Sequence, residues 1–484
     1  MGHELFFFLH IMLFFHTEVP YILVFSIDRQ LILTYNEGMS MRSFRGGVHP
    51  PEKKDVSSKE GIRCVLPSTK MVWIPITQGG APNEVQVKVG DKVAKGQLIA
   101  SSKSFVSAPV HSSVSGVVKK IEPHLVVGGQ EQPCVCIQLD GEDRLEKMPL
   151  VDPFSISKEE AIARIKMAGI TGMGGASFPT HVKLSPPPNA KIEYVIANGA
   201  ECEPYLCIDA ATMMTMAKEV VDGLSIVMKI ESCERGIIAI EANKKYLVPI
   251  LKDAISSSQS PNKDGISIEI CKTKYPQGGE KTLVKALLGR EIPSGGLPFQ
   301  IGCIIQNVGT LKAISDAFRL GLPLIERSLT ISGGAVEKPM NIVAPIGTCI
   351  GDLIPEEIKI KDSITKIISG GPMMGFAMKS ADFPIQKNTS GVLFLTKKET
   401  SLDEEDPCIG CARCVASCSC MLSPVLMVRA LKVGNLDEAL KLGLMDCVEC
   451  GACSYICPAH IKLVQRFRIG KQLFRLKMAK KGGK

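Results

Sequence analysis

Apolar and polar residues alternate over much of residues 63–140, and this alternation predicts short β-strands. The segment Val85–Ala100 shows it best, because apolar side chains recur at every second position and Gly-Asp and Lys-Gly pairs supply turns. The segments Val72–Ile76 and Val110–Val118 have a similar strand-like composition. We therefore predict a β-rich N-terminal module over residues 41–145.

After residue 150 the pattern changes to helical and strand segments that follow one another. Ser157–Ala168 is predicted to be a helix, because Ser157 can cap the first turn and two glutamates place negative charge there. The apolar run Glu193–Asn198 is typical of a buried strand. This succession predicts an α/β domain over residues 150–325.

The last third of the chain contains a second helical pattern. Thr396–Asp406 is polar and acidic, as linkers are. The segments Val425–Val433 and Leu436–Leu444 then show apolar residues at helical spacing, with a Gly-Asn break between them. We therefore expect a helical hairpin within a domain that covers residues 396–465.

Composition and charge narrow the class of protein. The 484 residues suffice for three or four domains, and 45% hydrophobic with 22% charged residues is an ordinary globular balance. Much of the net charge of +8 lies in a basic tail, residues 466–484, which suits an acidic partner, an anionic membrane surface or a frayed, solvated end. A single Trp argues against a nucleic-acid stacking platform, so we expect no nucleic-acid partner.

Residues 1–40 form a leader that differs from the rest of the chain. Leu5–Phe15 is strongly apolar but shorter than the ~20 residues that a membrane span needs. No Lys or Arg precedes it and no small-residue cleavage site follows, so it is a poor signal peptide. We expect translation to start at Met39 or Met41; a membrane-associating helix is the alternative.

Eight cysteines form two runs with the spacing C-x2-C-x2-C-x3-C. This spacing suits a tight loop around an iron–sulfur cube, and the fourth Cys of each run normally ligates the other cluster. We assign one [4Fe–4S] cluster to Cys408, Cys411, Cys414 and Cys457, and the other to Cys447, Cys450, Cys453 and Cys418. Structural zinc or disulfides are the alternatives, but zinc takes four ligands per site and rarely uses this spacing twice.

A glycine-rich segment, Gly169–Lys183, follows the predicted helix. Closely spaced glycines let backbone N–H groups approach a phosphate that Lys183 can neutralise, although a plain turn has the same composition. The next strand ends in Asn198-Gly-Ala-Glu201-Cys-Glu203, where ligands bind in open α/β sheets. Asn198 can face a flavin ring edge, and Glu201 and Glu203 can accept hydrogen bonds from ribose or nicotinamide groups; a solvated acidic turn is the alternative.

Together these motifs resemble the RnfC family, the C component of the Rnf ion-translocating oxidoreductase, and the flavin motifs resemble those of the flavoprotein subunit of respiratory complex I. Further RnfC-like segments follow in that family's order: Phe44–Pro51 at the start, Tyr275–Lys281, Pro293–Pro298, Gln306–Thr310 and Ser369–Gly375. The resemblance covers Met41–Lys471. One departure from complex I is Ala200, which stands where an acidic residue adjoins the flavin Asn.

The resemblance also implies which residues bind the cofactors. FMN would be held by Gly172, Gly174, Gly175, Lys183, Asn198, Glu201, Tyr275, Gly278, Asn307, Val308 and Thr310, and Glu203 and Glu280 would lie nearer NADH. Residues 326–395 resemble a β-grasp module of the SLBB type, and residues 396–465 a two-[4Fe–4S] ferredoxin-like domain. The N-terminal module resembles lipoyl- and biotinyl-type barrel-sandwiches, but Ala108–His111 offers no Lys for a swinging arm, so we predict a scaffold.

The function that the resemblance implies is that of a peripheral electron-transfer subunit of a membrane-bound complex of the ferredoxin:NAD oxidoreductase class. Electrons would pass between NAD(H), FMN and the two clusters while other Rnf subunits move ions; ferredoxin would be an indirect partner. The implied location is the cytoplasmic side of a bacterial inner membrane. The alternatives are a soluble flavin and iron–sulfur NADH dehydrogenase, a subunit of a bifurcating enzyme, or a cluster relay that binds no nucleotide.

Overall fold

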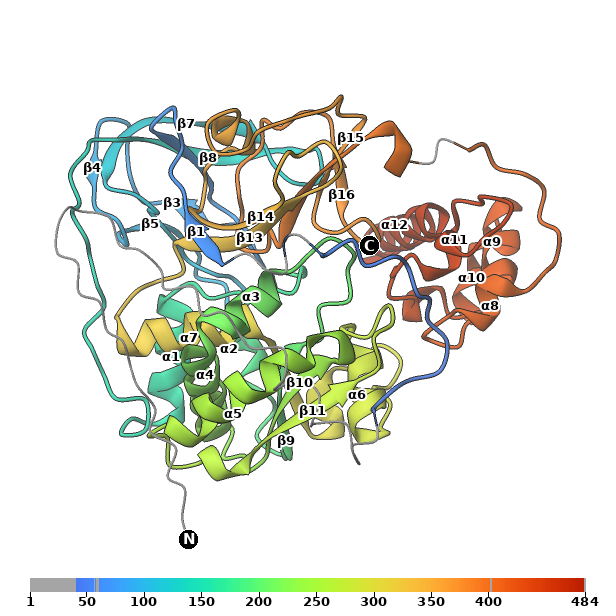
Figure 1. The fold of residues 1–484 in the computed structure, drawn as a ribbon, viewed down its shortest axis with the longest axis horizontal. Helices are drawn as coiled ribbons and strands as arrows, with labels where there is room; N and C mark the ends of the chain where they lie inside the picture. The colour runs from blue at the N-terminus through green and yellow to red at the C-terminus, as the bar shows by residue number, and fades with distance from the viewer. Residues whose placement is uncertain (1–40, 56, 58–60, 401–402, 483–484) are drawn as a thin grey trace, which may run out of the picture. The chain divides into compact units, whose positions relative to one another are not determined.

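A parallel four-stranded sheet forms the centre of the α/β domain in this computed structural model, which describes residues 41–55, 57, 61–400 and 403–482 (Figure 1). The strand order is β11-β10-β9-β12, with bounds β9 (Tyr194–Gly199), β10 (Gly236–Glu241), β11 (Ile266–Cys271) and β12 (Cys303–Asn307). The predicted strand at Glu193–Asn198 is thereby confirmed, one residue later. Because β12 pairs with β9 on the side opposite β10, the strand order reverses between β9 and β12. Ligands bind at such a reversal in open α/β sheets.

Helices cover both faces of this sheet. One face packs against α1 (Lys158–Met167), α4 (Ala217–Ile230), α5 (Val248–Ser257) and α7 (Val308–Arg319), and the other against α6 (Glu280–Leu288). Successive side chains of β9 point to opposite faces of the sheet. Val195 and Ala197 belong to the hydrophobic core on the first face, and Ile196 belongs to the core beneath α6 on the other face. The shorter elements are α2 (Thr180–Lys183), α3 (Ile208–Thr215), η3 (Ala242–Leu247), η4 (Lys263–Gly265) and η5 (Pro298–Ile301).

The predicted helix at Ser157–Ala168 is confirmed as α1, including its start. The Ser157 hydroxyl accepts a hydrogen bond from the Glu160 amide, and the Glu160 carboxylate accepts one from the Ser157 amide. This reciprocal capping box satisfies two amides that would otherwise lack partners. Ala161 and Ile165 then lie on the buried face of the helix.

The N-terminal module consists of two antiparallel sheets. The first has the order β2-β8-β7-β4, with β2 (Met71–Pro75), β4 (Lys92–Val93), β7 (Gly116–Leu125) and β8 (Glu131–Leu139). The second has the order β3-β5-β6, with β3 (Glu84–Val85), β5 (Leu98–Ser101) and β6 (Val110–His111). Apolar residues of this module, such as Ile74 and Ile137, belong to one core with residues of the α/β domain.

Five strands of a mixed six-stranded sheet lie between the α/β domain and the helical domain in the sequence, and the sixth, β1 (Ile62–Cys64), comes from near the N-terminus. The order of the sheet is β1-β14-β13-β17-β15-β16, with β13 (Glu326–Ser332), β14 (Met340–Pro345), β15 (Lys366–Ser369), β16 (Phe376–Met378) and β17 (Gly391–Leu395). The short helix η6 (Ile350–Leu353) follows β14. The two central strands, β13 and β17, run parallel, and each has an antiparallel neighbour on its other side.

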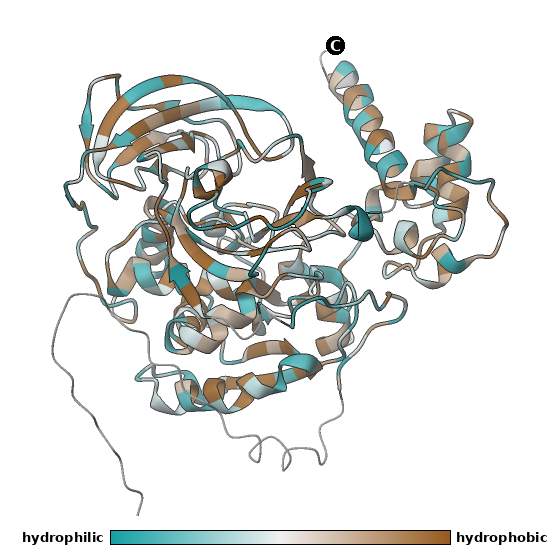
Figure 2. Ribbon diagram, turned by 45° about the horizontal axis from the view of Figure 1, so that its top comes forward, coloured by the Kyte–Doolittle hydropathy of each residue, from teal (hydrophilic) through white to brown (hydrophobic). Residues whose placement is uncertain are grey.

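The C-terminal part is helical. After η7 (Lys397–Glu399) it contains α8 (Arg413–Ala416), α9 (Pro424–Lys432), α10 (Leu436–Lys441), η8 (Leu444–Asp446), α11 (Ala452–Tyr455) and α12 (Leu463–Gly482). The predicted helical hairpin is confirmed by α9 and α10. Residues 466–482 of the basic tail lie within α12, along whose ribbon hydrophilic and hydrophobic residues alternate (Figure 2).

Among the described residues, every helix is too short or too polar to span a bilayer. The leader, residues 1–40, lies outside the described residues, and so do the predictions of a later start or a membrane-associating helix.

Candidate flavin and iron–sulfur site

The eight motif cysteines line two cavities in the helical domain. The cavity that we call the inner site is lined by the motif cysteines Cys418, Cys447, Cys450 and Cys453, and also by Cys420, which lies outside the motif. The other cavity, the outer site, is lined by Cys408, Cys411, Cys414 and Cys457. The structure therefore brings the fourth cysteine of each run together with the first three of the other run. Four thiols around one cavity are the donor set that a [4Fe–4S] cube requires.

Local backbone features wind the cysteine loops around these cavities. Ala412 and Glu449 adopt positive φ angles of 57° and 56°, and the short helices α8 and α11 begin just after the two loops turn. The Glu449 amide points at the Cys447 sulfur with a nitrogen–sulfur distance of 3.4 Å. Burial raises the pKa of the Cys447 thiol to about 11, so without a metal ion the thiol is protonated at neutral pH, and a bound metal ion would replace that proton.

The glycine loop leaves room for a ligand. A Cβ atom built on Gly174 would meet its nearest neighbour, Asn307 Cβ, at 3.7 Å, and one built on Gly175 would meet nothing within 4 Å. At Gly172 the nearest atom, the Phe178 carbonyl oxygen, lies at 3.6 Å. The loop is thus open where its side chains are missing, as a backbone cradle for a phosphate must be.

Buried polar groups fix the shape of this loop from below. The Met173 amide donates to Thr310 Oγ1 at 3.0 Å, and Arg327 Nη2 donates to the Met173 carbonyl at 3.1 Å. Asn388 Nδ2 donates to the Gly175 carbonyl at 3.0 Å. Val308 and Thr310 are buried in the first turn of α7, and a helix N-terminus favours anions.

Asn198 and Asn307 lie side by side at the ends of β9 and β12, where the strand order reverses. Asn198 Nδ2 donates to the Gly278 carbonyl at 2.8 Å, and its Oδ1 accepts from the Ala200 amide at 3.2 Å. Asn307 Oδ1 accepts from the Gly309 amide and caps α7. An amide group has two donor hydrogens and two lone pairs, so Asn198 keeps one of each for a ligand beyond these contacts.

Glu201 lies buried beside Asn198 with unused hydrogen-bonding capacity. Its Oε1 accepts from the Asp209 amide at 3.0 Å, whereas its Oε2 is buried and has no hydrogen-bond partner among the described residues. The backbone carbonyl of Glu201 accepts from the Lys54 and Lys244 ammonium groups at 2.6 and 3.0 Å. A buried carboxylate oxygen that lacks a partner is costly unless a ligand donates to it.

Glu203 and Tyr275 connect this edge of the sheet to the inner site. The Glu203 carboxylate accepts from the Met373 and Met374 amides at 3.1 and 3.0 Å, and burial raises its pKa to about 7. The Tyr275 hydroxyl lies 3.4 Å from Glu203 Oε1 and donates to the Cys450 carbonyl at 2.6 Å. One side chain therefore contacts both the acidic motif and a cysteine loop.

Gly278 faces the same edge of the sheet from the second glycine segment. A Cβ atom at this position would lie 2.1 Å from the Ala200 carbonyl oxygen, so the close contact between the two segments requires glycine. Lys183 and Glu280 pair with each other, since Lys183 Nζ donates to Glu280 Oε1 at 2.8 Å and to the Ile305 carbonyl at 2.9 Å. This places the predicted phosphate-neutralising lysine against the predicted nucleotide-binding glutamate.

The Phe44–Pro51 motif runs between the Tyr275 segment and the inner site. The Val48 amide donates to the Tyr275 carbonyl at 2.8 Å, and the Gly47 amide donates to the Ser417 carbonyl at 2.9 Å. A Cβ atom on Gly46, whose φ is +82°, would lie 2.6 Å from the Cys418 carbonyl oxygen. Only glycine fits there, which explains the Gly-Gly pair in this motif.

The sequence reasoning missed four buried charged residues at this site: Lys54, Asp209, Lys244 and Arg327. Asp209 accepts from Asn307 Nδ2 at 2.8 Å, and burial together with Glu201 raises its pKa. Burial lowers the pKa of Arg327 to about 10. Their contacts with this site join distant positions, such as Asp209 with Asn307 and Arg327 with Met173, so no local spacing marks them.

An α/β sheet whose strand order reverses, joined to two sets of four cysteines, is typical of an iron–sulfur protein with a further ligand site at the edge of the sheet. Three family models match the chain: the RnfC barrel sandwich hybrid domain at residues 42–142, the Nuo51 FMN-binding domain at residues 165–316 and the 4Fe-4S dicluster domain at residues 401–458. They confirm the predicted barrel-sandwich, flavin and two-cluster domains, and with them FMN and [4Fe–4S] clusters as cofactors.

Curated relatives identify the family. The chain is 44% identical to the C component of the proton-translocating ferredoxin:NAD(+) oxidoreductase complex of Clostridium ljungdahlii, over 88% of this chain and 93% of the relative. It is 40% identical to the same component of the Na(+)-translocating complex of Acetobacterium woodii (89% and 96%) and 37% identical to that of the ion-translocating oxidoreductase complex of Rhodobacter capsulatus (89% and 82%). The chain belongs to this RnfC family, so the predicted resemblance is confirmed.

Proposed function

We propose that this chain is the electron-transfer subunit of a membrane-bound ferredoxin:NAD+ oxidoreductase whose partner subunits translocate ions. The contact that carries the proposal is the hydrogen bond from Tyr275 to the Cys450 carbonyl, because it joins the ligand-binding edge of the α/β sheet to the inner site. The names of the relatives, which are components of ferredoxin:NAD(+) oxidoreductase complexes, support the same reaction class.

The residues that would hold the cofactors follow from the contacts described above. FMN would lie against the open loop Gly172–Gly175 and the paired ends of β9 and β12. Near these strand ends the buried Glu201 Oε2 has no hydrogen-bond partner among the described residues, so it could accept a hydrogen bond from the ligand. Glu203 and Glu280 would lie nearer NADH. The inner and outer sites would each hold one [4Fe–4S] cluster on four thiolates. Bound FMN supplies the exchange between two-electron transfer with NAD(H) and one-electron transfer with the clusters.

The surroundings of the two cluster sites determine the order in which electrons from the flavin would reach them. The inner site adjoins the α/β domain through Tyr275 and the Gly46-Gly47 segment. At the outer site, Cys408 and Cys411 are exposed, and Ile409 is 71% exposed. An exposed apolar side chain beside exposed thiols suits docking of a partner protein. The cluster in the inner site would therefore exchange electrons with the flavin, and the cluster in the outer site would exchange them with the partner protein.

The six-stranded sheet is proposed to be the β-grasp module. A β-grasp core has two hairpins whose first and last strands lie in parallel at the centre. The pairing β14-β13-β17-β15, with β13 and β17 parallel, has this arrangement, and η6 takes the place of the crossing helix. Arg327 on β13 and Asn388 before β17 both contact the flavin loop, so this module would position that loop.

The partners would be the other subunits of an Rnf complex, with ferredoxin an indirect one. The chain would be a peripheral subunit on the cytoplasmic side of a bacterial inner membrane. The relatives' names describe complexes that move protons or Na+, and such complexes act at membranes.

A pair of glycine variants tests the flavin assignment. Gly175 and Gly128 both have positive φ angles, +110° and +99°, and a Cβ on either would meet nothing within 4 Å. Gly175→Val fills the proposed cradle, whereas Gly128→Val applies the same backbone strain to a hairpin of the N-terminal module. We expect purified wild type and Gly128→Val to retain FMN that NADH bleaches under anaerobic conditions, and Gly175→Val to lose it. Retention of reducible FMN by Gly175→Val would refute the assignment.

A further inference from the structure

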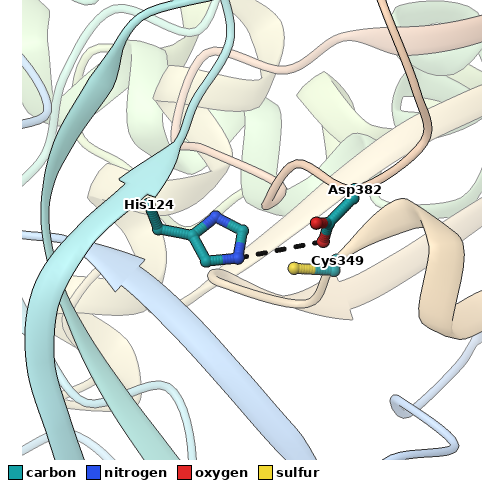
Figure 3. A group of neighbouring side chains, drawn as sticks. All are labelled: His124, Cys349 and Asp382. Carbon is teal, nitrogen blue, oxygen red and sulfur yellow. Dashed lines mark ion pairs between the residues drawn. The ribbon is translucent and has the colours of Figure 1, made fainter.

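Three potential metal ligands meet away from the flavin and iron–sulfur sites. His124 lies near the end of β7, Cys349 lies just before η6, and Asp382 lies in the loop between β16 and β17. Figure 3 shows the three side chains pointing toward one another from separate segments. Their ligand atoms all lie within 4.8 Å of one another.

The hydrogen bonding of His124 fixes which ring nitrogen is available. His124 Nδ1 lies 3.0 Å from the Leu125 carbonyl oxygen, which can only accept, so Nδ1 carries the proton. Nε2 then presents a lone pair toward Asp382 Oδ1 at 3.8 Å. A neutral imidazole and a carboxylate that face each other in this way are both acceptors, and a cation between them satisfies both. Histidines that bind metal ions show the same Nδ1 arrangement.

The scaffold around the three ligands is rigid. The His124 ring packs on Trp73 with 4.4 Å between ring centroids, and the His124 side chain is 13% exposed. The loops that carry Cys349 and Asp382 are bonded together, since the Ile350 amide donates to the Phe383 carbonyl at 3.1 Å. The Asp382 side chain is 74% exposed and can adjust its rotamer. A site with two fixed ligands and one adjustable ligand can close on an ion at little cost.

The surroundings favour a cation. Asp352 lies near the same group, and its Oδ2 accepts from Thr69 Oγ1 at 3.0 Å. Asp352 and Asp382 both lie close enough to the Cys349 thiol for their negative charge to act on it, and that charge therefore favours a cation at this group.

We propose that His124 Nε2, Cys349 Sγ and the Asp382 carboxylate bind one zinc ion, with water as the fourth ligand. Imidazole, thiolate and carboxylate together form a mixed donor set that zinc accepts in tetrahedral geometry. Tetrahedral coordination at ~2.0–2.3 Å requires ligand atoms about 3.5 Å apart, so the distances between the ligand atoms must shorten by at most about 1 Å. The ion would tie the N-terminal module, through β7, to two loops of the six-stranded sheet.

The test is zinc content measured together with iron content on the purified full-length protein. After dialysis against micromolar Zn2+ and gel filtration, we expect one zinc per chain in wild type at full cluster iron. Asp382→Ala should lose this equivalent, whereas Asp362→Ala, an exposed aspartate of the same sheet module, should keep it. Cys349→Ser should lose it too, with the exposed Cys64→Ser as its control. Because Asp382 is exposed, its variant is expected to fold even if Cys349→Ser does not.

A spectroscopic measurement removes ambiguity about where the ion binds. Co2+ bound to a thiolate gives a charge-transfer absorption, which should appear as the difference between wild type and Cys349→Ser at equal iron content. The proposal is overturned if wild type at full iron content takes up no zinc. It is also overturned if Asp382→Ala and Asp362→Ala hold equal amounts of zinc.

Discussion

Replacing Lys387 with methionine changes how the stability of the protein depends on pH. Lys387 is fully buried, and its Nζ donates to the Pro109 and Gly169 carbonyls at 2.7 Å each. It thereby joins the N-terminal module to the start of the flavin loop. Burial lowers the pKa of this lysine from 10.5 to about 7. A neutral amine still has two N–H donors, so both hydrogen bonds persist without the charge.

The magnitude follows from linkage. Between about pH 7 and about pH 10.5 the folded protein releases this proton while the unfolded chain keeps it, so the unfolded state binds more protons and stability rises with pH. Each pH unit in this interval adds ~1.4 kcal/mol to the free energy of unfolding, so this free energy rises by ~3 kcal/mol between pH 7 and pH 9.5. Burial lowers the pKa of the neighbouring His111 to about 3, so His111 stays neutral throughout the interval.

The assay is the thermal midpoint of unfolding of wild type and Lys387→Met from pH 7 to pH 9.5. Methionine leaves two buried carbonyls without a donor, a cost of about 1–3 kcal/mol each that does not vary with pH. The advantage of wild type over the variant should therefore widen as the pH rises. The exposed Lys119→Met is the matched control and should show a constant difference. A constant difference for Lys387→Met as well would refute a neutral buried lysine.

Three further predictions concern single side chains. Tyr275→Phe removes the donor to the Cys450 carbonyl and should slow reduction of the inner cluster more than it slows reduction of FMN by NADH, at unchanged iron content, as stopped-flow absorbance can show. Burial raises the pKa of Glu203 from 4.5 to about 7, so the contribution of this residue to the stability of wild type falls as the pH rises from about 4.5 to about 7. Glutamine does not titrate, so the melting temperature of Glu203→Gln should rise relative to that of wild type over this interval. Ser157→Ala breaks the capping box of α1 and should cost ~1 kcal/mol, seen as a lower urea midpoint at unchanged slope, whereas an unchanged midpoint would contradict the role of the cap.

Local signals predicted the elements that depend on neighbours in the sequence. Ser157 marks the start of α1 because capping involves residues three apart, and the apolar run before Asn198 marks β9 because buried parallel strands are apolar throughout. The cysteine spacing likewise predicted the grouping of Cys418 with the second run, since the crossover is a property of the motif.

Contacts between distant segments could not be predicted in this way. Arg327 reaches Met173 across 154 positions, and Lys54 reaches Glu201 across 147. Such contacts depend on how sheets and loops pack, which no local spacing records. The same holds for His124 and Asp382, which were scattered polar residues in the sequence and become neighbours only through the packing of β7 against the loops of the six-stranded sheet.

The order of the two cluster sites is the central claim, and anaerobic reduction by NADH of two cysteine variants tests it most directly. Cys408→Ala should leave only the inner cluster and Cys447→Ala only the outer one, each with half the iron of wild type. We predict that NADH reduces the cluster of Cys408→Ala as fast as the first cluster of wild type, and that of Cys447→Ala far more slowly, at equal FMN content. Equal rates in the two variants, or the reverse order, would contradict the arrangement in which the inner site lies between the flavin domain and the outer site.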